Sequence, residues 1–106
     1  LNRVSIFEDY TGTGIAWGIG AGVDKDFLVN INSGLPKEDV SILLDGKRFI
    51  EARESNHLHE TDDDLTERVR KSHLELAKLF DWRVVNANQS IEYVHDDIWD
   101  IVKNFF

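Results

Sequence analysis

Three short apolar segments that alternate with helical segments are the feature that most constrains how this chain can fold. The apolar segments are residues 2–8, 40–44 and 83–87, and the second is nearly continuously apolar. Strands that alternate with helices are typical of an α/β layer with a parallel sheet, whose strands are buried on both faces. We therefore predict one α/β domain over residues 1–106, without an interdomain linker.

Helical periodicity is present in the segments between and after these strands. We predict a short helix over 24–32, a longer one over 61–80 and a last one over 90–103. The last helix carries a regular apolar stripe, which we expect to seal one face of the sheet, with the two terminal phenylalanines in the core. The stripe consists of Ile91, Val94, Ile98, Ile101 and Phe105.

Composition excludes several classes of protein. The 106 residues include no cysteine, so disulfide scaffolds, cysteine-based zinc sites and thiol catalysis are excluded. Twelve basic residues against twenty acidic ones give a net charge of −8, which argues against a broad contact with nucleic acid. No apolar run approaches the roughly 18 residues of a membrane span, so we expect no membrane partner. Methionine is absent even at position 1, so the chain is expected to be a fragment or a processed product.

A glycine-dense stretch follows the first apolar segment. Five glycines lie between Gly12 and Gly22, which predicts a flexible turn or a close approach of the backbone to something else. The stretch is not a Walker A loop, because the Gly-Lys-Ser/Thr sequence does not occur. It is not a dinucleotide fingerprint either, because the third glycine position is Trp17.

Polar residues stand at the predicted carboxyl ends of the strands, where open α/β sheets bind ligands. They are Glu8 and Asp9, Asp45, and Asn86. The first pair could hold a metal ion or accept a proton, or it could merely begin a turn. The sequence His57-Leu-His59-Glu60 lies in a polar segment and lacks a further ligand at a defined spacing, so we interpret it as a solvated loop rather than a metal site.

Residues 34–45 read GLPKEDVSILLD, residues 82–98 read WRVVNANQSIEYVHDDI, and residues 10–17 read YTGTGIAW. All three resemble segments of the eukaryotic-type thymidylate kinase family, and the first is similar to the family's GLPKPD segment and the strand after it. Residues 82–98 are similar to W-x-x-(V/I)-D-A-x-x-S-I-E-x-V-H-x-(D/E)-I, and residues 10–17 to Y-x-x-S-G-x-A-(Y/F). The motifs occur in the family's order and at close to its spacing, over about residues 4–103.

This resemblance implies a fold and an activity. The fold would be the carboxyl-terminal portion of a nucleoside monophosphate kinase: a P-loop-kinase-like parallel sheet with flanking helices, incomplete because the P-loop strand and first helices are absent. The family transfers the γ-phosphoryl group of ATP to dTMP, which gives dTDP and ADP and requires Mg²⁺. Homodimerisation and a cytoplasmic location are further expectations from the resemblance.

The resemblance also implies roles for particular residues. Glu8 or Asp9 would be the catalytic acid near Mg²⁺, Arg48 and Arg53 would belong to a lid over about residues 46–63, and Asn86 and Ala87 would border the adenine of ATP. The acceptor nucleotide would contact Tyr10, Thr13, Gly14, Trp17 and His59.

Some family positions are altered. Aligned without a gap to the family's D-R-Y motif, Glu8 replaces the aspartate and Asp9 replaces the phosphate-binding arginine, and an aspartate there would repel phosphate. A one-residue shift of the alignment would restore Asp9 as the acid, but the arginine would still be lost. The lid motif E-R-Y-E appears as His57-Leu-His-Glu60. Two alternatives therefore stay open: a non-catalytic nucleotide-binding remnant or pseudoenzyme, and an acidic α/β interaction domain. Without a P-loop, the isolated chain is not expected to phosphorylate dTMP.

Overall fold

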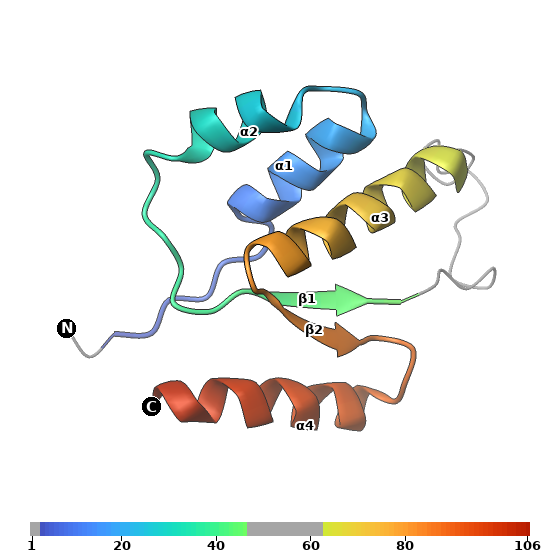
Figure 1. Cartoon of the computed structure of the whole chain (residues 1–106). Helices are drawn as coiled ribbons and strands as arrows, with labels where there is room; N and C mark the ends of the chain where they lie inside the picture. Colours follow the sequence, from blue (N-terminus) through green and yellow to red (C-terminus); the bar gives the residue numbers. More distant parts are fainter. Residues whose placement is uncertain (1–2, 47–62) are drawn as a thin grey trace.

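The computed structural model describes residues 3–46 and 63–106. Two parallel strands form its sheet, with Ile42 opposite Arg83 and Asp45 opposite Asn86 (Figure 1). None of the helices within the described residues is long and apolar enough to span a membrane. The elements in chain order are α1 (Thr11–Gly20), α2 (Lys25–Asn32), β1 (Ile42–Asp45), α3 (Asp63–Leu79), β2 (Arg83–Asn86), α4 (Ile91–Val102) and a 3₁₀ turn, η3 (Lys103–Phe105).

The helices lie in layers on the two sides of the sheet. α3 lies on one side and contacts β1, whereas α4 lies on the other side and contacts β2 (Figure 1). α1 packs on α3, and α2 packs on α1. Within the described residues, the structure confirms five predicted elements, and their observed ends lie within two residues of the predicted ones. These elements were predicted over 24–32, 40–44, 61–80, 83–87 and 90–103.

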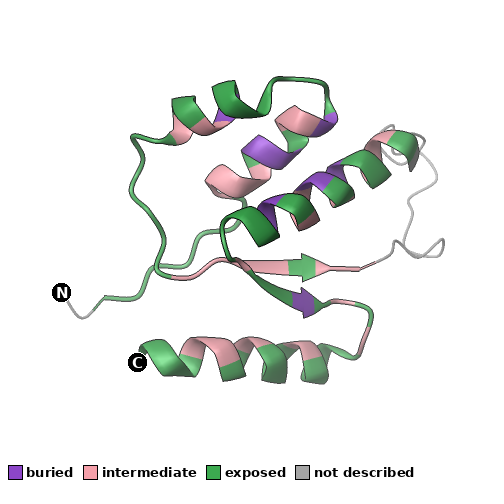
Figure 2. Ribbon diagram, in the orientation of Figure 1, coloured by how far each residue is buried: buried purple, intermediate pink, exposed green. Residues whose placement is uncertain are grey.

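Most buried residues lie between the helices, although Val85 of β2 is buried as well. Ile15 and Ala16 of α1, Leu28 of α2 and Leu76 of α3 form one buried cluster, with Trp82 packed against it. Figure 2 shows the buried residues concentrated on the facing sides of α1 and α3. The best-covered part of the molecule is therefore the α1–α2–α3 layer.

Local side-chain and backbone hydrogen bonds define several helix ends. The Asp24 carboxylate accepts from the backbone N–H of Phe27 at 3.0 Å, and the Ser90 hydroxyl oxygen, as predicted, accepts from that of Tyr93 at 3.2 Å. At the end of α3, the N–H of Trp82 donates to the carbonyl of Ala77 at 2.8 Å. Asp81 adopts the left-handed conformation that this type of helix end requires, with φ of 57°.

The first two predictions that need correction concern the amino-terminal third. The described part of the predicted strand 2–8 forms no strand, because no other strand in the described residues lies beside it to pair with. The glycine-dense stretch is not a flexible turn but helix α1. Its close backbone approach is confirmed, since a Cβ at Gly12 would lie 2.5 Å from the Trp82 ring and one at Gly20 would lie 2.6 Å from Val69 Cγ2.

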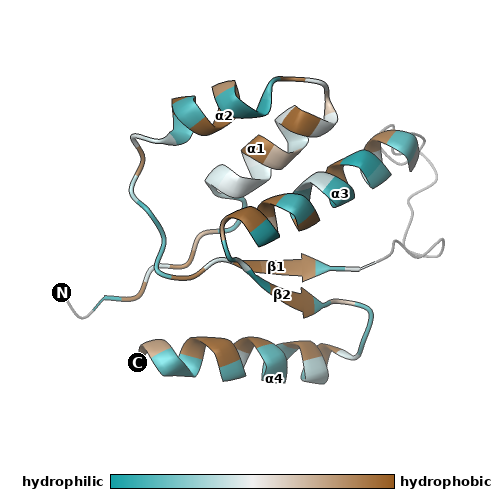
Figure 3. Cartoon of the chain, in the orientation of Figure 1, coloured by the Kyte–Doolittle hydropathy of each residue, from teal (hydrophilic) through white to brown (hydrophobic). Residues whose placement is uncertain are grey.

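Three further predictions of burial are wrong. β1 is not buried on both faces, since Leu44 is 52% exposed. No residue of α4 is fully buried, although its apolar side faces the strands (Figure 3). Phe105 and Phe106 are exposed rather than core residues. Among the described elements, the main helix contacts of the strands are those of α3 with β1 and of α4 with β2, and these leave Leu44 and Val84 about half exposed.

Candidate functional site

Helix α1 turns one face to the core and another to solvent. Ile15 and Ala16 are buried, whereas Gly14 and Trp17 are exposed. Thr13 lies four residues before Trp17 and Gly14 three residues before it, so all three share one side of the helix. The structure thus brings together Thr13, Gly14 and Trp17, three residues predicted to contact the acceptor nucleotide.

Gly14 differs from the other glycines of α1 in what surrounds it. A Cβ at Gly14 would meet no atom of the described residues within 4 Å, whereas a Cβ at Gly12, Gly18 or Gly20 would meet a side chain at 2.7 Å or less. Packing within the described residues therefore requires glycine at three of these positions but not at Gly14. Gly14 is therefore open to solvent on the side of the helix that carries Trp17.

Residues 8–10 lead into α1 and anchor its start. The Tyr10 hydroxyl donates to the carbonyl of Pro36 at 2.8 Å, and its ring stacks on Phe7 with centroids 5.3 Å apart. Asp9 adopts a left-handed conformation with φ of 58°, which aspartate tolerates better than most residues. Glu8 and Asp9 are both exposed to solvent.

The two adjacent carboxylates suit Mg²⁺ in donor chemistry. This ion is commonly held by one or two carboxylates together with the phosphates of a substrate. The described residues contain no group of three or more His, Cys, Asp or Glu side chains that could hold a metal by themselves. The donor chemistry of Glu8 and Asp9 is therefore compatible with Mg²⁺, but the described residues do not form a metal site by themselves.

A second cluster of polar groups lies at the carboxyl ends of β1 and β2. Asp45 accepts from Arg70 Nε at 2.9 Å and from Arg70 Nη2 at 3.1 Å, and its backbone carbonyl accepts from the N–H of Ala87 at 2.7 Å. The side chain of Asn86 accepts from the backbone N–H of Asn88 at 2.9 Å. These bonds fix the turn after β2, which contains the predicted adenine-bordering residues Asn86 and Ala87.

The guanidinium group of Arg70 lowers the pKa of Asp45 below its ordinary value of 3.8, mainly through the hydrogen bonds and also through its charge. Partial burial of the carboxylate opposes this effect. Sequence reasoning identified Asp45 but missed Arg70. The available signal was weak, since Arg70 lies 25 residues away on the helix that joins the two strands.

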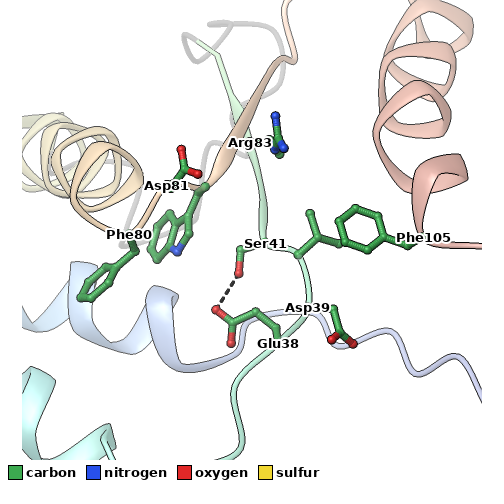
Figure 4. Close-up of a pocket in the computed structure, with 9 residues that line it drawn as sticks. Glu38, Asp39, Ser41, Phe80, Asp81, Arg83 and Phe105 are labelled. Atoms are coloured by element: carbon green, nitrogen blue, oxygen red, sulfur yellow. Dashed lines mark hydrogen bonds between the residues drawn. The ribbon is translucent and has the colours of Figure 1, made fainter. Parts of the chain in front are cut away.

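The structure also has a hollow of about 160 Å³ at the opposite, amino-terminal end of the strands. Figure 4 shows its acidic rim, where the Ser41 hydroxyl donates to Glu38 at 2.7 Å and Asp39 and Asp81 lie close by. A wider hollow of about 410 Å³ lies beside α3 and is lined by Ile19, Lys25 and Leu76 among others. Neither hollow contains a residue that the sequence predicted for the site.

The remaining predicted site residues are Arg48, Arg53 and His59, and the predicted lid contains all three. They lie outside the described residues. Their roles stay predictions.

Comparison with known proteins gives one consistent result. Residues 1–98 match the family described as Thymidylate kinase. A protein of Pyrococcus horikoshii described as "Probable thymidylate kinase" is 34% identical over 108 residues, which cover 96% of this chain and 53% of that protein. A protein of Sulfolobus acidocaldarius with the same description is 33% identical, over 97% of this chain and 56% of its own length. No solved structure matches.

These matches agree with the three motifs and with the parallel order of β1 and β2. The chain spans about half the length of the curated relatives it matches. It belongs to the thymidylate kinase family, of which it represents a carboxyl-terminal half.

Proposed function

We propose that this chain supplies the acceptor-nucleotide face and the adenine-bordering turn of an enzyme that transfers the γ-phosphoryl group of ATP to dTMP. The family match over residues 1–98 carries this proposal. The open side of α1 around Gly14 supports it, because an exposed tryptophan beside a glycine with free space suits a planar base.

Each described residue has a proposed part in binding. Trp17 stacks on the thymine, Gly14 permits the base to approach the helix backbone, and the Thr13 hydroxyl forms a hydrogen bond with the acceptor. Tyr10 holds the start of α1 in place through Pro36. Asn86 and Ala87 border the adenine, in a turn that Asp45 and Arg70 help to fix.

Glu8 or Asp9 is the proposed acid at the reacting phosphates. Mg²⁺, when bound, neutralises phosphate charge during the transfer, and whichever of the two carboxylates is this acid would help to hold it. In either alignment of the D-R-Y motif the phosphate-binding arginine of the family is lost, and without a gap Asp9 takes its place, so the proposed site holds dTMP with one positive group fewer. The same substitution is the observation that favours the second candidate, a nucleotide-binding protein without catalysis.

The test joins this chain to the amino-terminal half of the Pyrococcus horikoshii relative and measures dTMP binding by calorimetry and dTDP formation from ATP. Trp17→Ala should weaken dTMP binding by about tenfold or more, the loss expected when a stacked aromatic worth about 1.4 kcal/mol is removed. Trp99→Ala is the matched control, because Trp99 is similarly exposed on α4, and should bind like the parent.

The possible results separate the candidates. Binding that depends on Trp17 together with dTDP formation supports the kinase. Trp17-dependent binding without dTDP formation indicates the non-catalytic protein. A folded fusion whose dTMP affinity is unchanged by Trp17→Ala contradicts the proposed site.

A further inference from the structure

The first turn of α1 lies against the ring of Trp82, the last residue before β2. A Cβ at Gly12 would lie 2.5 Å from two atoms of this ring, Cη2 and Cζ2. Figure 1 shows the start of α1 beside the connection from α3 to β2. Because Gly12 directly precedes Thr13 and Gly14, the contact lies in the turn that carries two of the proposed acceptor contacts.

Trp82 is itself held in place by elements other than α1. Its backbone N–H donates to the carbonyl of Ala77 at 2.8 Å, and its ring stacks on that of Phe80 with centroids 6.2 Å apart. The next residue, Arg83, donates its backbone N–H to the carbonyl of Ser41 at 2.9 Å as β2 begins. Trp82 is thus fixed by α3 on one side and by the sheet on the other, and it gives α1 a fixed surface to pack on.

The fit between this ring and the helix depends on the sizes of both residues. A methyl group at Gly12 would overlap the ring of Trp82. Because packed interiors contain few voids, the extra atom would have to displace either the ring or the first turn of α1. Trp82→Phe removes Cη2 and Cζ2 and would leave a space there instead. The position of the first turn is therefore set by Gly12 and Trp82 together.

Trp82 also relates the two proposed nucleotide sites to each other. β2 begins directly after Trp82 and ends at Asn86, which Ala87 follows. The proposed acceptor helix is thus held at one end of β2, and the adenine-bordering turn lies at the other. Phosphoryl transfer depends mainly on the placement of donor and acceptor, and a displacement of about 1 Å can cost about 100-fold in rate. A residue that fixes α1 relative to β2 therefore bears on the position of dTMP relative to ATP.

We propose that Trp82 is a positioning residue for the acceptor nucleotide: through its contact with Gly12 it fixes the first turn of α1, where the helix meets dTMP. The proposal rests on the proposed function. The ring packs against the buried cluster that contains Ala16, one helical turn after Gly12. Trp82 therefore lies on the core side of α1 rather than on its open side, and it acts through the helix without touching the nucleotide.

The experiment uses the fusion with the amino-terminal half of the Pyrococcus horikoshii relative and measures dTMP and ATP affinity by calorimetry. Gly12→Ala and Trp82→Phe should each weaken dTMP binding by at least about fivefold, because the first turn of α1 is displaced or loosened. In the double variant the new methyl group occupies the space that the ring leaves, so dTMP affinity should return to within about twofold of the parent. ATP affinity should stay within about twofold in all three variants, because β1 fixes the adenine-bordering turn.

Trp99→Phe is the matched control. It makes the same chemical change on α4, where Trp99 is 51% exposed and stacks on Phe106, and it should bind both nucleotides like the parent. Circular dichroism and thermal melts should show each variant folded at the temperature of the calorimetry. Trp82→Phe adds no atoms and no polar group, so this variant decides the question by itself if Gly12→Ala does not fold.

Parental dTMP affinity in a folded Trp82→Phe variant would overturn the proposal. Equal losses of dTMP and ATP affinity would overturn it too, since they would show a general effect on the fold, as would a double variant that binds dTMP no better than the single variants. If Trp17→Ala weakens dTMP binding but Trp82→Phe does not, this proposal fails and the proposed function stands. A folded parent fusion that does not bind dTMP would refute the proposed function and this proposal with it.

Discussion

The α1–α2–α3 layer buries its apolar side chains more completely than the sheet and α4 do. In the helical layer, Ile15, Ala16, Leu28 and Leu76 bury one another, and Gly12, Gly18 and Gly20 let side chains approach the backbone of α1. In α4, Ile91 is 85% exposed and no residue is buried. The helical layer is therefore self-contained, whereas the sheet layer has apolar surface still to cover.

The largest expected effect comes from truncation in the self-contained layer. Leu76 is only 2% exposed, so Leu76→Ala should lower the free energy of unfolding by about 2–5 kcal/mol. Ile91→Ala in α4 should change it by less than about 0.5 kcal/mol, as is usual for surface substitutions. Urea denaturation of the two variants checks this contrast, and equal losses would mean that the two layers are equally packed.

The glycines of α1 allow packed and open positions to be compared within a single helix. Gly20→Ala should destabilise the chain by about 1–3 kcal/mol, because the new methyl group would meet the branched Val69 side chain and lie 3.4 Å from its backbone. Gly14→Ala should stabilise it by up to about 1 kcal/mol, because the space there is open and alanine favours helix. Thermal melts that shift in the same direction for both would contradict the packing described for α1.

The Asp45–Arg70 pair links the two layers and gives a pH dependence. The pKa of Asp45 is lowered in the folded state, so its contribution to stability is present above pH 3.8 and is lost as the pH falls through the lower, folded value. Asp45→Asn should therefore destabilise the chain at pH 7, and the difference from the parent should shrink at a pH below 3.8. Denaturation curves at the two pH values test this. A difference in stability that grows in acid would show that the ion pair of Asp45 with Arg70 does not stabilise the folded chain.

The smallest expected effect concerns the end of α3. Asp81 occupies a left-handed position where glycine is usual. Asp81→Gly should raise the stability by up to about 1 kcal/mol, since glycine adopts this conformation without steric cost. A lower melting temperature for the variant would show that the Asp81 side chain stabilises the fold by more than its left-handed backbone conformation costs.

Periodicity predicted the elements whose signals are local. β1, β2, α2, α3 and α4 all follow from short apolar runs or helical stripes, and Ser90 was identifiable as a helix cap. Helix α1 was not predictable from propensity, because glycine disfavours helix. Its glycines lie close to side chains of Trp82 and Val69, which are about 50 to 70 residues further along the chain, so a local propensity does not capture these contacts.

The remaining errors concern partners rather than local preference. Residues 4–7 have the composition of a strand, but a strand needs a neighbour to pair with, and composition does not say whether one is present. The motifs identified Thr13, Gly14 and Trp17, and the structure places them on one open helix face. They did not identify Arg70, since its pairing with Asp45 depends on the packing of α3 against β1.

Hydrogen exchange of the 106-residue chain alone tests the central contrast most directly. We expect the amides of Ile15, Ala16, Leu76 and Ala77 to exchange slowest, and those in α4 to exchange at least about tenfold faster. We also expect residues 4–7 to exchange at nearly the rate of an unfolded chain. Equal protection of α4 and α3 would show that the chain unfolds as one unit, and would contradict the division into a self-contained layer and an unfinished one.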